Sequence, residues 1–349
     1  MSKRLLNESE GTMKKQLSIK DIAKLSNVST ATVSRVLNDN GRFSKETREK
    51  VLAVVKEFGY STNSVAKTLR EQKSNTIGMI VPDISNEFFS SLITQIESYF
   101  FDKGISTIIC NTNKDAEKEK AYLKSLDAKL IDGLICISGQ EEIDETQLSR
   151  DIPIVCIDRK PKVSSNIAIV GSDHSEGGYT ATKFLIDKGC KRILLLTKDN
   201  NTTSSNDRIA GYEKALKDSH LQVDSDLIVR ASSKKMSKFE TAQKSIEEVL
   251  SKGLKFDGIF ATNDWLAYGA VQTLEKNKIS VPDEVKVVGF DDDSISKYTS
   301  PSITTIHQDV TGIAEKSADI LYQLMSKPDM QINKRYINVA TKLIERETT

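Results

Sequence analysis

A segment of small, polar and basic side chains, residues 29–38, has the residue types that read base edges in DNA. Its apolar residues recur at helical spacing and define one face, which leaves the polar side chains on the other. There, Arg35 can make a bidentate contact to guanine, and Thr30 and Ala31 are small enough to approach a thymine methyl group. We expect the amino-terminal residues of this helix to enter the major groove. The outward-facing residues are Thr30, Ala31, Thr32, Ser34, Arg35 and Asn38.

Hydroxyl, amide and basic side chains around this segment suit phosphate contacts, which position a protein on DNA without specifying a sequence. Residues 1–75 hold 15 Lys and Arg against 8 Asp and Glu, a net charge of +7, whereas residues 76–349 hold 35 against 41, a net charge of −6. A basic head on an acidic body is what a phosphate-binding module joined to a sensing module needs. The expected phosphate contacts are Ser29, Ser34, Asn38, Arg42, Ser44, Thr47 and Tyr60.

Three helices are expected to hold this segment in place. Ser18, Ser29 and Ser44 each precede an amphipathic run as potential N-caps, and Gly59 ends the third run. Asn27 lies in the four-residue break between the first two helices, where the chain needs a residue that tolerates the left-handed conformation. The arrangement is that of a helix-turn-helix, although an ordinary three-helix fold shows a similar pattern. The expected core residues are Ile22, Ala23, Leu25, Val33, Val36, Leu37, Val51, Leu52, Val55 and Phe58.

The rest of the chain has the alternating pattern of an α/β protein. Continuous apolar segments alternate with amphipathic helices, which indicates parallel sheets covered on both faces, and there are enough of them for two lobes. Such lobes bind ligands at the carboxyl ends of their strands, where polar residues cluster in this sequence. The expected strands are residues 77–81, 107–110, 134–137, 154–157, 193–196, 259–261 and 285–290.

These patterns divide the chain into four regions. Residues 1–17 are polar and aperiodic and are expected to form a disordered arm, followed by the helix-turn-helix at residues 18–60. Residues 61–75 form a hinge whose central segment is too short to be a stable helix alone. Residues 76–349 form the two-lobed domain.

Several motifs resemble those of the lactose-repressor (LacI/GalR) family. Residues 18–38 read SIKDIAKLSNVSTATVSRVLN and match the helix-turn-helix signature of that family almost throughout, with Asn27 where the family usually has Gly. The resemblance extends from residue 18 to the end of the chain. Further matching segments are residues 44–51, 58–60, 63–69, 287–292 and 343–348.

The resemblance implies an all-α helix-turn-helix head on a two-lobed α/β domain with the fold of type I periplasmic sugar-binding proteins. The two-lobed domain would bind the effector and form a homodimer. In that fold the chain crosses between the lobes three times, so we expect residues 310–325 to return to the first lobe. The resemblance also implies hinges that become helical when paired on DNA, with Leu69 wedged between base pairs in the minor groove. Ala66 and Lys67 would lie close to the groove floor and its phosphates, and Asn63 is a further candidate DNA contact. Without the family, Leu69 is simply a linker residue.

Polar residues at the strand ends match the effector positions of the family. Carboxylate, amide and guanidinium groups can satisfy sugar hydroxyls, and Phe88 and Phe89 can stack on a sugar ring. The set most resembles that of ribose-type binders and favours ribose or another pentose, although His174 and Ser138 stand where those binders usually have Asn. Each residue taken alone could equally maintain the fold. The expected effector-binding residues are Asn86, Phe88, Phe89, Asp158, Arg159, Arg208, Asn263, Asp291 and Gln308.

Other classes of function have little support in the sequence. It contains no phosphate-binding Gly-rich loop, zinc-protease motif or nucleophile elbow, so we expect neither an enzyme nor a bound cofactor. The four widely spaced cysteines predict reduced thiols and no metal site. No apolar segment approaches the roughly 20 residues that span a membrane, and no signal peptide is apparent, which predicts a cytoplasmic protein. A transport binding protein would need that signal and no DNA-binding head.

The expected function is repression of a carbohydrate-utilisation operon by a homodimer that binds double-stranded operator DNA and is released by a small sugar. Two alternatives keep the DNA-binding head. One is a carbon-control regulator whose signal is a phosphocarrier protein, and the other is a regulator with a non-sugar, purine-type corepressor. No heptad repeat follows Ala340, which favours a dimer over a tetramer.

Overall fold

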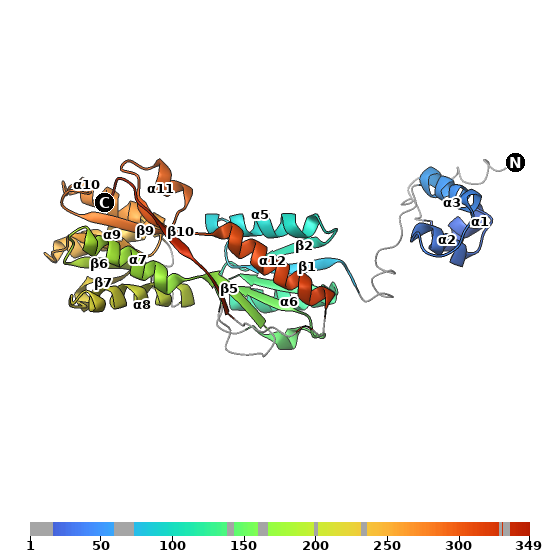
Figure 1. Ribbon diagram of the computed structural model, residues 1–349, viewed down its shortest axis with the longest axis horizontal. Helices are drawn as coiled ribbons and strands as arrows, with labels where there is room; N and C mark the ends of the chain where they lie inside the picture. Colours follow the sequence, from blue (N-terminus) through green and yellow to red (C-terminus); the bar gives the residue numbers. More distant parts are fainter. Residues whose placement is uncertain are drawn as a thin grey trace. The chain divides into compact units, whose positions relative to one another are not determined.

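The computed structural model describes residues 17–58, 73–137, 143–159, 167–198, 202–231, 236–327, 330 and 336–349. Its contacts divide the chain into two compact units, Met1–Lys73 and Ser74–Thr349 (Figure 1). Most of the predicted arm and hinge lies outside the described residues, so the boundaries of the four regions stay predictions. Five candidate DNA contacts also lie outside the described residues: Tyr60, Asn63, Ala66, Lys67 and Leu69.

The first unit contains the three predicted helices: α1 (Ile19–Leu25), α2 (Thr30–Leu37) and α3 (Lys45–Phe58). The side chains of Ser18 and Ser29 cap α1 and α2, and the Ser44 hydroxyl accepts a hydrogen bond from a backbone N–H in the first turn of α3. Asn27 has φ 56°, the left-handed conformation predicted for the turn between α1 and α2. The three predicted caps and the turn residue are therefore confirmed.

The core of this unit is smaller than predicted. Leu25, Leu52 and Phe58, which were expected to be buried, are 49%, 40% and 45% exposed. Leu52 lies about 100° further round α3 than Val51, which takes the core position. Leu25 and Phe58 are the last residues of their helices, and Val28 packs against the core just beyond α1. The buried residues are Ile22, Ala23, Val33, Val36 and Val51.

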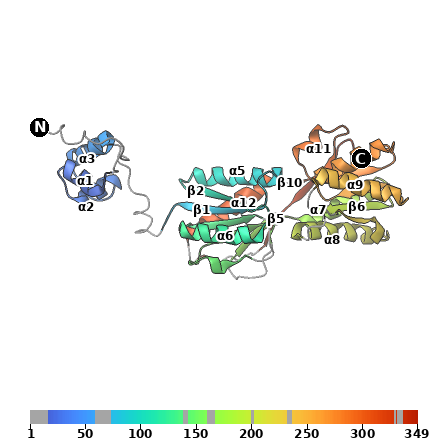
Figure 2. The same ribbon diagram turned by 180° about the vertical axis from the view of Figure 1, so that it is seen from behind.

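The first lobe of the second unit is a parallel sheet with the strand order β11-β5-β4-β3-β1-β2. Its central strands are continuously apolar because α5 and α12 cover one face and α6 the other (Figures 1 and 2). The strands are β1 (Thr76–Val81), β2 (Ser106–Asn111), β3 (Gly133–Ile137), β4 (Ile154–Ile157), β5 (Ile167–Ser172) and β11 (Tyr336–Val339). The helices are α5 (Glu87–Phe101), α6 (Ala116–Ala128), α12 (Val310–Ser326) and the short η1 (Glu145–Gln147).

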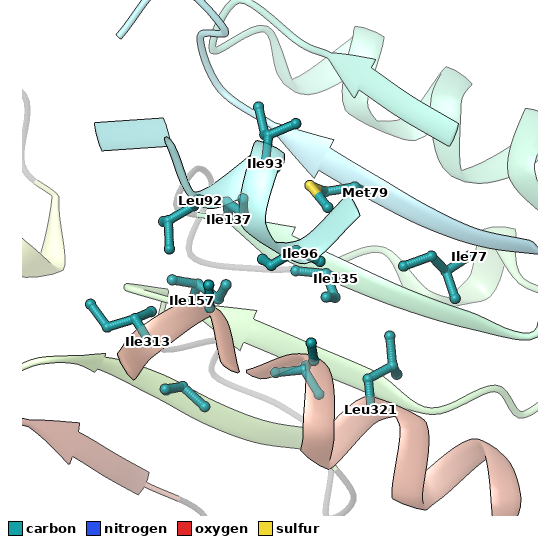
Figure 3. Close-up of a cluster of buried hydrophobic side chains, with 14 of the residues drawn as sticks. Ile77, Met79, Leu92, Ile93, Ile96, Ile135, Ile137, Ile157, Ile313 and Leu321 are labelled. Atoms are coloured by element: carbon teal, nitrogen blue, oxygen red, sulfur yellow. The ribbon is translucent and has the colours of Figure 1, made fainter. Parts of the chain in front are cut away.

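The buried cluster between this sheet and α5 and α12 joins segments that are far apart in the sequence (Figure 3). Ile96 of α5 lies over Met79 and Ile135 of the sheet, and Ile313 and Leu321 extend from α12 into the same cluster. Burial of such side chains is the main stabilising contribution to a core. The predicted return of residues 310–325 to the first lobe is confirmed.

The second lobe repeats this arrangement with the strand order β12-β10-β9-β8-β6-β7, and β12 runs antiparallel to β10. Alternate residues of its strands face α9 and α10 on one side and α7 and α8 on the other. The strands are β6 (Ile193–Lys198), β7 (Ile228–Ala231), β8 (Gly258–Ala261), β9 (Lys286–Asp291), β10 (Thr304–Gln308) and β12 (Thr341–Ile344). The helices are α7 (His174–Asp187), α8 (Thr203–Asp218), α9 (Lys238–Ser251), α10 (Asp264–Lys276), α11 (Ser294–Tyr298) and the short η2 (Ser225–Leu227).

The chain crosses between the lobes three times, as predicted: from β5 to α7, from β10 to α12 and from β11 to β12. All seven predicted strands are present, with small shifts in their bounds. The sequence analysis missed β5, which follows β4 after only nine residues, too few for the helix that the alternating pattern leads one to expect. It also missed β7, β11 and β12, which are four-residue strands at the edges of their sheets, and β10 was not among the seven expected strands, although Gln308 was expected at a strand end.

Candidate functional site

The outer face of α2 carries the side chains predicted to read bases, while its inner face is buried in the core of the first unit. Within the described part of the chain, the Arg35 guanidinium forms no ion pair, and its stem lies beside Gly41. The Asn38 amide donates to the Ser34 carbonyl oxygen at 2.8 Å, at the end of the helix. The exposed candidates are Thr30, Ala31, Arg35 and Asn38, and the partly exposed ones are Thr32 and Ser34.

Two similar pairs of hydroxyl groups stand at the starts of α2 and α3. Ser29 Oγ lies 2.9 Å from Thr32 Oγ1, and Ser44 Oγ lies 2.8 Å from Thr47 Oγ1. Each serine also accepts from the backbone N–H of its threonine at 3.1 Å. Helix amino termini with hydroxyl groups suit phosphate, and Arg42 is exposed in the segment between the two helices. The assignment of these residues to DNA contacts stays a prediction.

In the second lobe, a close contact between α7 and α8 positions two of the candidate effector residues. A Cβ atom on Gly211 would lie 2.1 Å from the Ser175 carbonyl oxygen, and one on Gly178 would lie 2.3 Å from the Arg208 carbonyl oxygen. Only glycine allows the helices to approach so closely. About one turn toward the amino ends of these helices, Arg208 Nε donates to His174 Nδ1 at 3.3 Å.

Arg208 is the centre of a group of polar side chains that we call the interlobe cluster: Asp158, His174, Arg208, Asn263, Asp291 and Gln308. The Arg208 guanidinium lies 3.1 Å from Asp291 Oδ1, donates to the Thr262 carbonyl oxygen at 2.5 Å and sits 3.6 Å above the Phe290 ring. The side chains of Arg208 and Asp291 are only 10% and 9% exposed. The planar guanidinium is therefore held in a single orientation by a carboxylate, a carbonyl and a ring.

Asp291 joins three strand ends of the second lobe. Gln308 Nε2 donates to its Oδ1 at 2.7 Å, and Asn263 Nδ2 donates to its Oδ2 at 2.5 Å. Asp291 has φ 110°, a strained conformation of the kind that clusters at functional sites. Asn263 also caps α10 by accepting from the backbone N–H of Trp265 at 3.0 Å. Asp291 thus braces three strand ends and Asn263 caps a helix, so both residues also have the fold-maintaining role that remains the alternative to effector binding.

Asp158, which follows β4, connects the first lobe to this cluster. It has φ 50°, accepts from the backbone N–H of Ser172 at 3.2 Å and lies 3.0 Å from His174 Nε2. His174 thus lies between two charged groups: its Nδ1 accepts from Arg208, and its Nε2 approaches Asp158 at ion-pair distance without forming a well-aligned hydrogen bond. A continuous polar chain therefore runs from Asp158 through His174 and Arg208 to Asp291. The histidine that departs from the ribose-type pattern lies inside the cluster.

Arg159 does not join the cluster. Its Nη2 donates to Glu119 Oε1 of α6 at 2.8 Å, and the two side chains are 1% and 7% exposed. Asp158 has a left-handed φ and contacts His174 of the second lobe, whereas the next residue, Arg159, bonds within the first lobe and also lines the pocket described below. Its predicted contact with the effector stays a prediction.

The predicted aromatic residues lie at the start of α5 in the first lobe. Asn86 caps α5, and its side chain accepts from the backbone N–H of Phe89 at 3.2 Å. Phe88 is buried in the core of the lobe, whereas Phe89 is partly buried and packs against that core. Their ring centroids are 5.6 Å apart in an edge-to-face arrangement. Of the two rings, Phe89 keeps more accessible surface for a ligand.

A pocket of about 150 Å³ adjoins the interlobe cluster. It is lined by Asp158 and His174, by Ser172 at the end of β5, by Thr203 of α8 and by Asn338 of β11. The Ser172 hydroxyl is buried and has no hydrogen-bond partner among the described residues. The pocket can therefore accept a small polar group. Ser138, the second departure from the ribose-type pattern, lies outside the described residues.

Two further residues of the site lie outside the expected effector-binding set, although the sequence places Asp264 beside Asn263 at the same strand end. The Thr262 carbonyl oxygen accepts from Arg208, a backbone role that leaves no signal in residue type. Asp264 is fully buried and accepts from Thr305 Oγ1 at 2.5 Å and from the backbone N–H of Asp293 at 2.8 Å. Burial, with the Asp291 carboxylate as the second cause, raises the pKa of Asp264 well above its usual value. Its position after β8 was the only signal.

The described residues hold no group of three side chains that could ligate a metal ion. None of the helices in the described segments combines the length and the apolar composition of a membrane span. All four cysteines are buried and unpaired by disulfides, and burial raises the pKa of Cys136 to about 12, which makes this thiol a poor nucleophile.

Two family models match the chain. Residues 18–63 match the model described as bacterial regulatory proteins, lacI family, and residues 182–349 match the model described as periplasmic binding protein-like domain. The first match contains α1 to α3, and the second contains most of the second lobe together with α12.

Three curated relatives are similar over 95% of this chain. The transcriptional regulator RegA of Clostridium saccharobutylicum is 37% identical over 99% of its own length. The transcriptional repressor PurR of Vibrio campbellii is 34% identical over 98% of its length. The ribose operon repressor of Halalkalibacterium halodurans is 34% identical over 96% of its length.

Two solved structures are also similar to this chain. The lac repressor dimer bound to operator and the anti-inducer ONPF is 27% identical, with a TM-score of 0.82 over 96% of this chain and 99% of that one. A LacI transcriptional regulator from Alkaliphilus metalliredigens complexed with D-xylulofuranose is 31% identical, with a TM-score of 0.68 over 79% of this chain and 98% of that one.

Proposed function

The chain belongs to the lacI family of bacterial regulatory proteins, and from this premise we propose that a small sugar, ribose or another pentose, releases it from the operator of a carbohydrate-utilisation operon. The chain is a transcriptional repressor with a DNA-binding helix-turn-helix and a periplasmic-binding-protein-like sensing domain, not an enzyme. The observation that carries the proposal is the interlobe cluster. In it, one guanidinium, two carboxylates and two amides from both lobes converge beside a single imidazole.

The chemistry of the cluster suits a polyol. Each sugar hydroxyl both donates and accepts, and the cluster offers donors and acceptors side by side. Two buried acceptors, Gln308 Oε1 and Ser172 Oγ, have no partner among the described residues, and a ligand hydroxyl can donate to either. Phe89 provides a partly exposed ring against which the apolar face of a sugar can pack. A sugar with an inverted hydroxyl leaves buried polar groups unpaired, which gives the site its selectivity.

The names of two relatives support a pentose. One curated relative is a ribose operon repressor, and one similar structure holds D-xylulofuranose, a five-carbon sugar. The described candidates for the effector site in this chain are Asn86, Phe88, Phe89, Asp158, Arg159, Arg208, Asn263, Asp291 and Gln308.

In the proposed mechanism, two heads of a homodimer bind the half-sites of a near-palindromic operator. Thr30, Ala31 and Arg35 approach base edges, and Leu69 of each hinge wedges into the minor groove. The effector draws the two lobes together around the interlobe cluster, shifts the first lobes of the dimer and disfavours the paired hinges. Because such coupling is reciprocal, operator DNA must weaken effector binding by the same factor.

The hinge part of this mechanism has a simple test. Leu69→Ala should weaken specific operator binding, because the wedge that kinks the duplex is lost, while leaving the thermal unfolding of the protein unchanged. Fluorescence anisotropy with a labelled operator duplex measures the affinity. Equal affinities for the variant and the wild type would contradict the wedge.

The effector part is tested by the fluorescence of Trp265, the single tryptophan, whose backbone bonds to Asn263. Titration of the full chain with D-ribose, other pentoses and hexoses should give a saturable change with one pentose. Arg208→Met should abolish that change, because it removes the centre of the cluster. Arg230→Met removes an exposed arginine of the same lobe and should bind the sugar as the wild type does. A response that survives Arg208→Met would contradict the proposed site.

A second candidate function keeps the DNA-binding head and reverses the sign of the signal, as the sequence analysis allowed; the relative PurR is likewise a transcriptional repressor. In this alternative, a purine-type corepressor strengthens operator binding instead of weakening it. Hypoxanthine and guanine belong in the same fluorescence panel, and the sign of their effect on operator affinity separates the two functions. If no small molecule binds, a phosphocarrier protein is the next ligand to titrate.

A further inference from the structure

A direct contact outside the effector candidates joins the two lobes. Glu87, the first residue of α5, accepts from the backbone N–H of Ser294 at 3.0 Å through both carboxylate oxygens, and from the Ser294 hydroxyl at 2.7 Å. Ser294 begins α11 in the second lobe. Hydrogen bonds to an ionised carboxylate are stronger than those between neutral groups. We call this contact the interlobe bridge.

A buried carboxyl group stands immediately beside the interlobe bridge. Asp293 precedes Ser294 and is only 4% exposed. Its backbone N–H donates to Asp264 Oδ2 at 2.8 Å. Its own Oδ2 has no hydrogen-bond partner among the described residues. An ionised carboxylate in this position is costly, because part of its charge is neither hydrated nor bonded.

The charges that face Asp293 come from both lobes. Burial is the largest cause that raises the pKa of Asp293, to about 7, and the Asp291 carboxylate is the second. Glu87 raises this pKa further from across the lobes, while Lys238 and Arg208 oppose the shift. The groups around Asp293 are thus Asp264 of α10, Asp291 of β9, Glu87 of α5, Lys238 of α9 and Arg208 of α8.

We infer that the interlobe bridge and Asp293 together make closure of the lobes proton-linked: with the lobes together, Asp293 holds a proton taken from solvent, and the Glu87 carboxylate holds Ser294. Separation of the lobes takes the Glu87 charge away from Asp293 and admits water to it. The closed state then binds this proton more tightly than the open one. Glu87 and Asp293 are positioning residues, since neither belongs to the interlobe cluster.

The direction of the effect on effector affinity follows from this difference. The pKa of Asp293 is higher in the closed state, so protonation favours closure below about pH 7 and the advantage is lost as the pH rises through that value. This step rests on the proposed function, in which the effector binds the closed lobes. Linkage to one proton limits the change in effector affinity to about tenfold per pH unit. We expect D-ribose to bind about threefold tighter at pH 6 than at pH 8.

The first experiment needs no ligand. The side-chain carboxyl of Asp293 is titrated by ¹³C NMR in the full chain labelled at aspartate Cγ, with Asp293→Asn to assign its signal. Glu87→Gln should lower the midpoint of Asp293, because it removes a facing negative charge. Glu97→Gln removes the charge of an exposed glutamate on the same helix and should leave the midpoint unchanged. Equal midpoints in Glu87→Gln and the wild type would overturn the inference.

The second experiment measures the Kd of D-ribose between pH 6 and pH 8 by Trp265 fluorescence. The wild type and Glu97→Gln should bind more tightly at pH 6, and Asp293→Asn should lose that dependence while still binding. A dependence that persists in Asp293→Asn, or its absence in the wild type, would also overturn the inference. Failure of the wild type to bind D-ribose at any pH contradicts the proposed effector instead, and the NMR titration still decides on the proton linkage.

Discussion

The DNA-reading head and the interlobe cluster arrange polar side chains in opposite ways. In the head, the candidate contacts are neighbours along α2, are mostly exposed and leave the Arg35 guanidinium without an ion pair in the described part of the chain. In the cluster, the side chains come from strand and helix ends of two lobes, are largely buried and bond to one another.

Because of this difference, substitutions in the head and in the cluster should differ in how they affect protein stability and ligand binding. The head keeps its polar groups in water until DNA provides partners, so a substitution there should affect operator binding while barely changing the fold. The cluster satisfies most of its own groups, so a substitution there leaves a neighbour unpaired and should affect both effector binding and stability. The following substitutions test this contrast, in order of decreasing expected effect.

Asp291→Ala should have the largest effect, because it leaves the buried Arg208 guanidinium without its carboxylate. Breaking a buried ion pair by removing one partner costs about 3–5 kcal/mol, and sugar binding should be lost as well. Urea unfolding and the Trp265 titration measure the two effects. Asp226→Ala, at an exposed aspartate of the same lobe, is the control and should change stability by less than about 0.5 kcal/mol. An Asp291→Ala protein as stable as this control would contradict the contrast.

Gly211→Ala should come next, since its Cβ atom would lie 2.1 Å from the Ser175 carbonyl oxygen. The helices α7 and α8 must separate, which costs about 1–3 kcal/mol of unfolding free energy and moves His174 away from Arg208. Thermal unfolding and sugar affinity should both fall. Ala210→Ser adds an atom on the exposed face of the same helix and should leave both unchanged. Normal sugar binding by Gly211→Ala would show that the two helices do not set the geometry of the cluster.

Arg35→Ala should weaken operator binding by about 1–3 kcal/mol, the range expected for loss of a bidentate contact to guanine. Because Arg35 is exposed, the free energy of unfolding should stay within about 0.5 kcal/mol of the wild type. Lys50→Ala, which removes an exposed charge paired with Glu46 on α3, controls for the change in net charge. Anisotropy titration would contradict the prediction if both variants lost affinity equally.

Substitution of the two N-cap serines of the head should have the smallest effects of this series, and the two variants should differ only in operator affinity. Ser18→Ala and Ser29→Ala each remove a cap and should each cost about 1 kcal/mol of stability. Only Ser29→Ala should also reduce operator affinity, because Ser29 caps α2, the helix that we propose enters the major groove. Parallel losses of affinity in the two variants would indicate a general effect of stability instead of a phosphate contact.

Local signals in the sequence were sufficient to predict the N-caps of the head and the left-handed turn between its first two helices. The caps and the left-handed turn depend on residues within three or four positions of one another, and all were predicted correctly. Errors appeared where tertiary packing decides, at Leu25, Leu52 and Phe58, because a short amphipathic helix has more apolar residues than a small core can bury.

The site in the two-lobed domain was predictable only in part. Strand ends and the family resemblance pointed to Arg208, Asp291 and Gln308, which the structure brings together. The different partners of Asp158 and Arg159 depend on the left-handed backbone of Asp158 just after β4, and the contact of His174 with Arg208 depends on two glycines that let helices touch. Neither feature has a signal in residue type alone.

The central claim is that a sugar held by the interlobe cluster releases the head from DNA. The most direct test is fluorescence anisotropy of the full chain on an operator duplex selected from random sequences by the protein itself, with and without D-ribose or the pentose found in the panel. Our account predicts weaker operator binding in the presence of the sugar, and no change in Arg208→Met. Tighter binding, or an unchanged affinity of the wild type for a duplex that it binds specifically, would contradict the account.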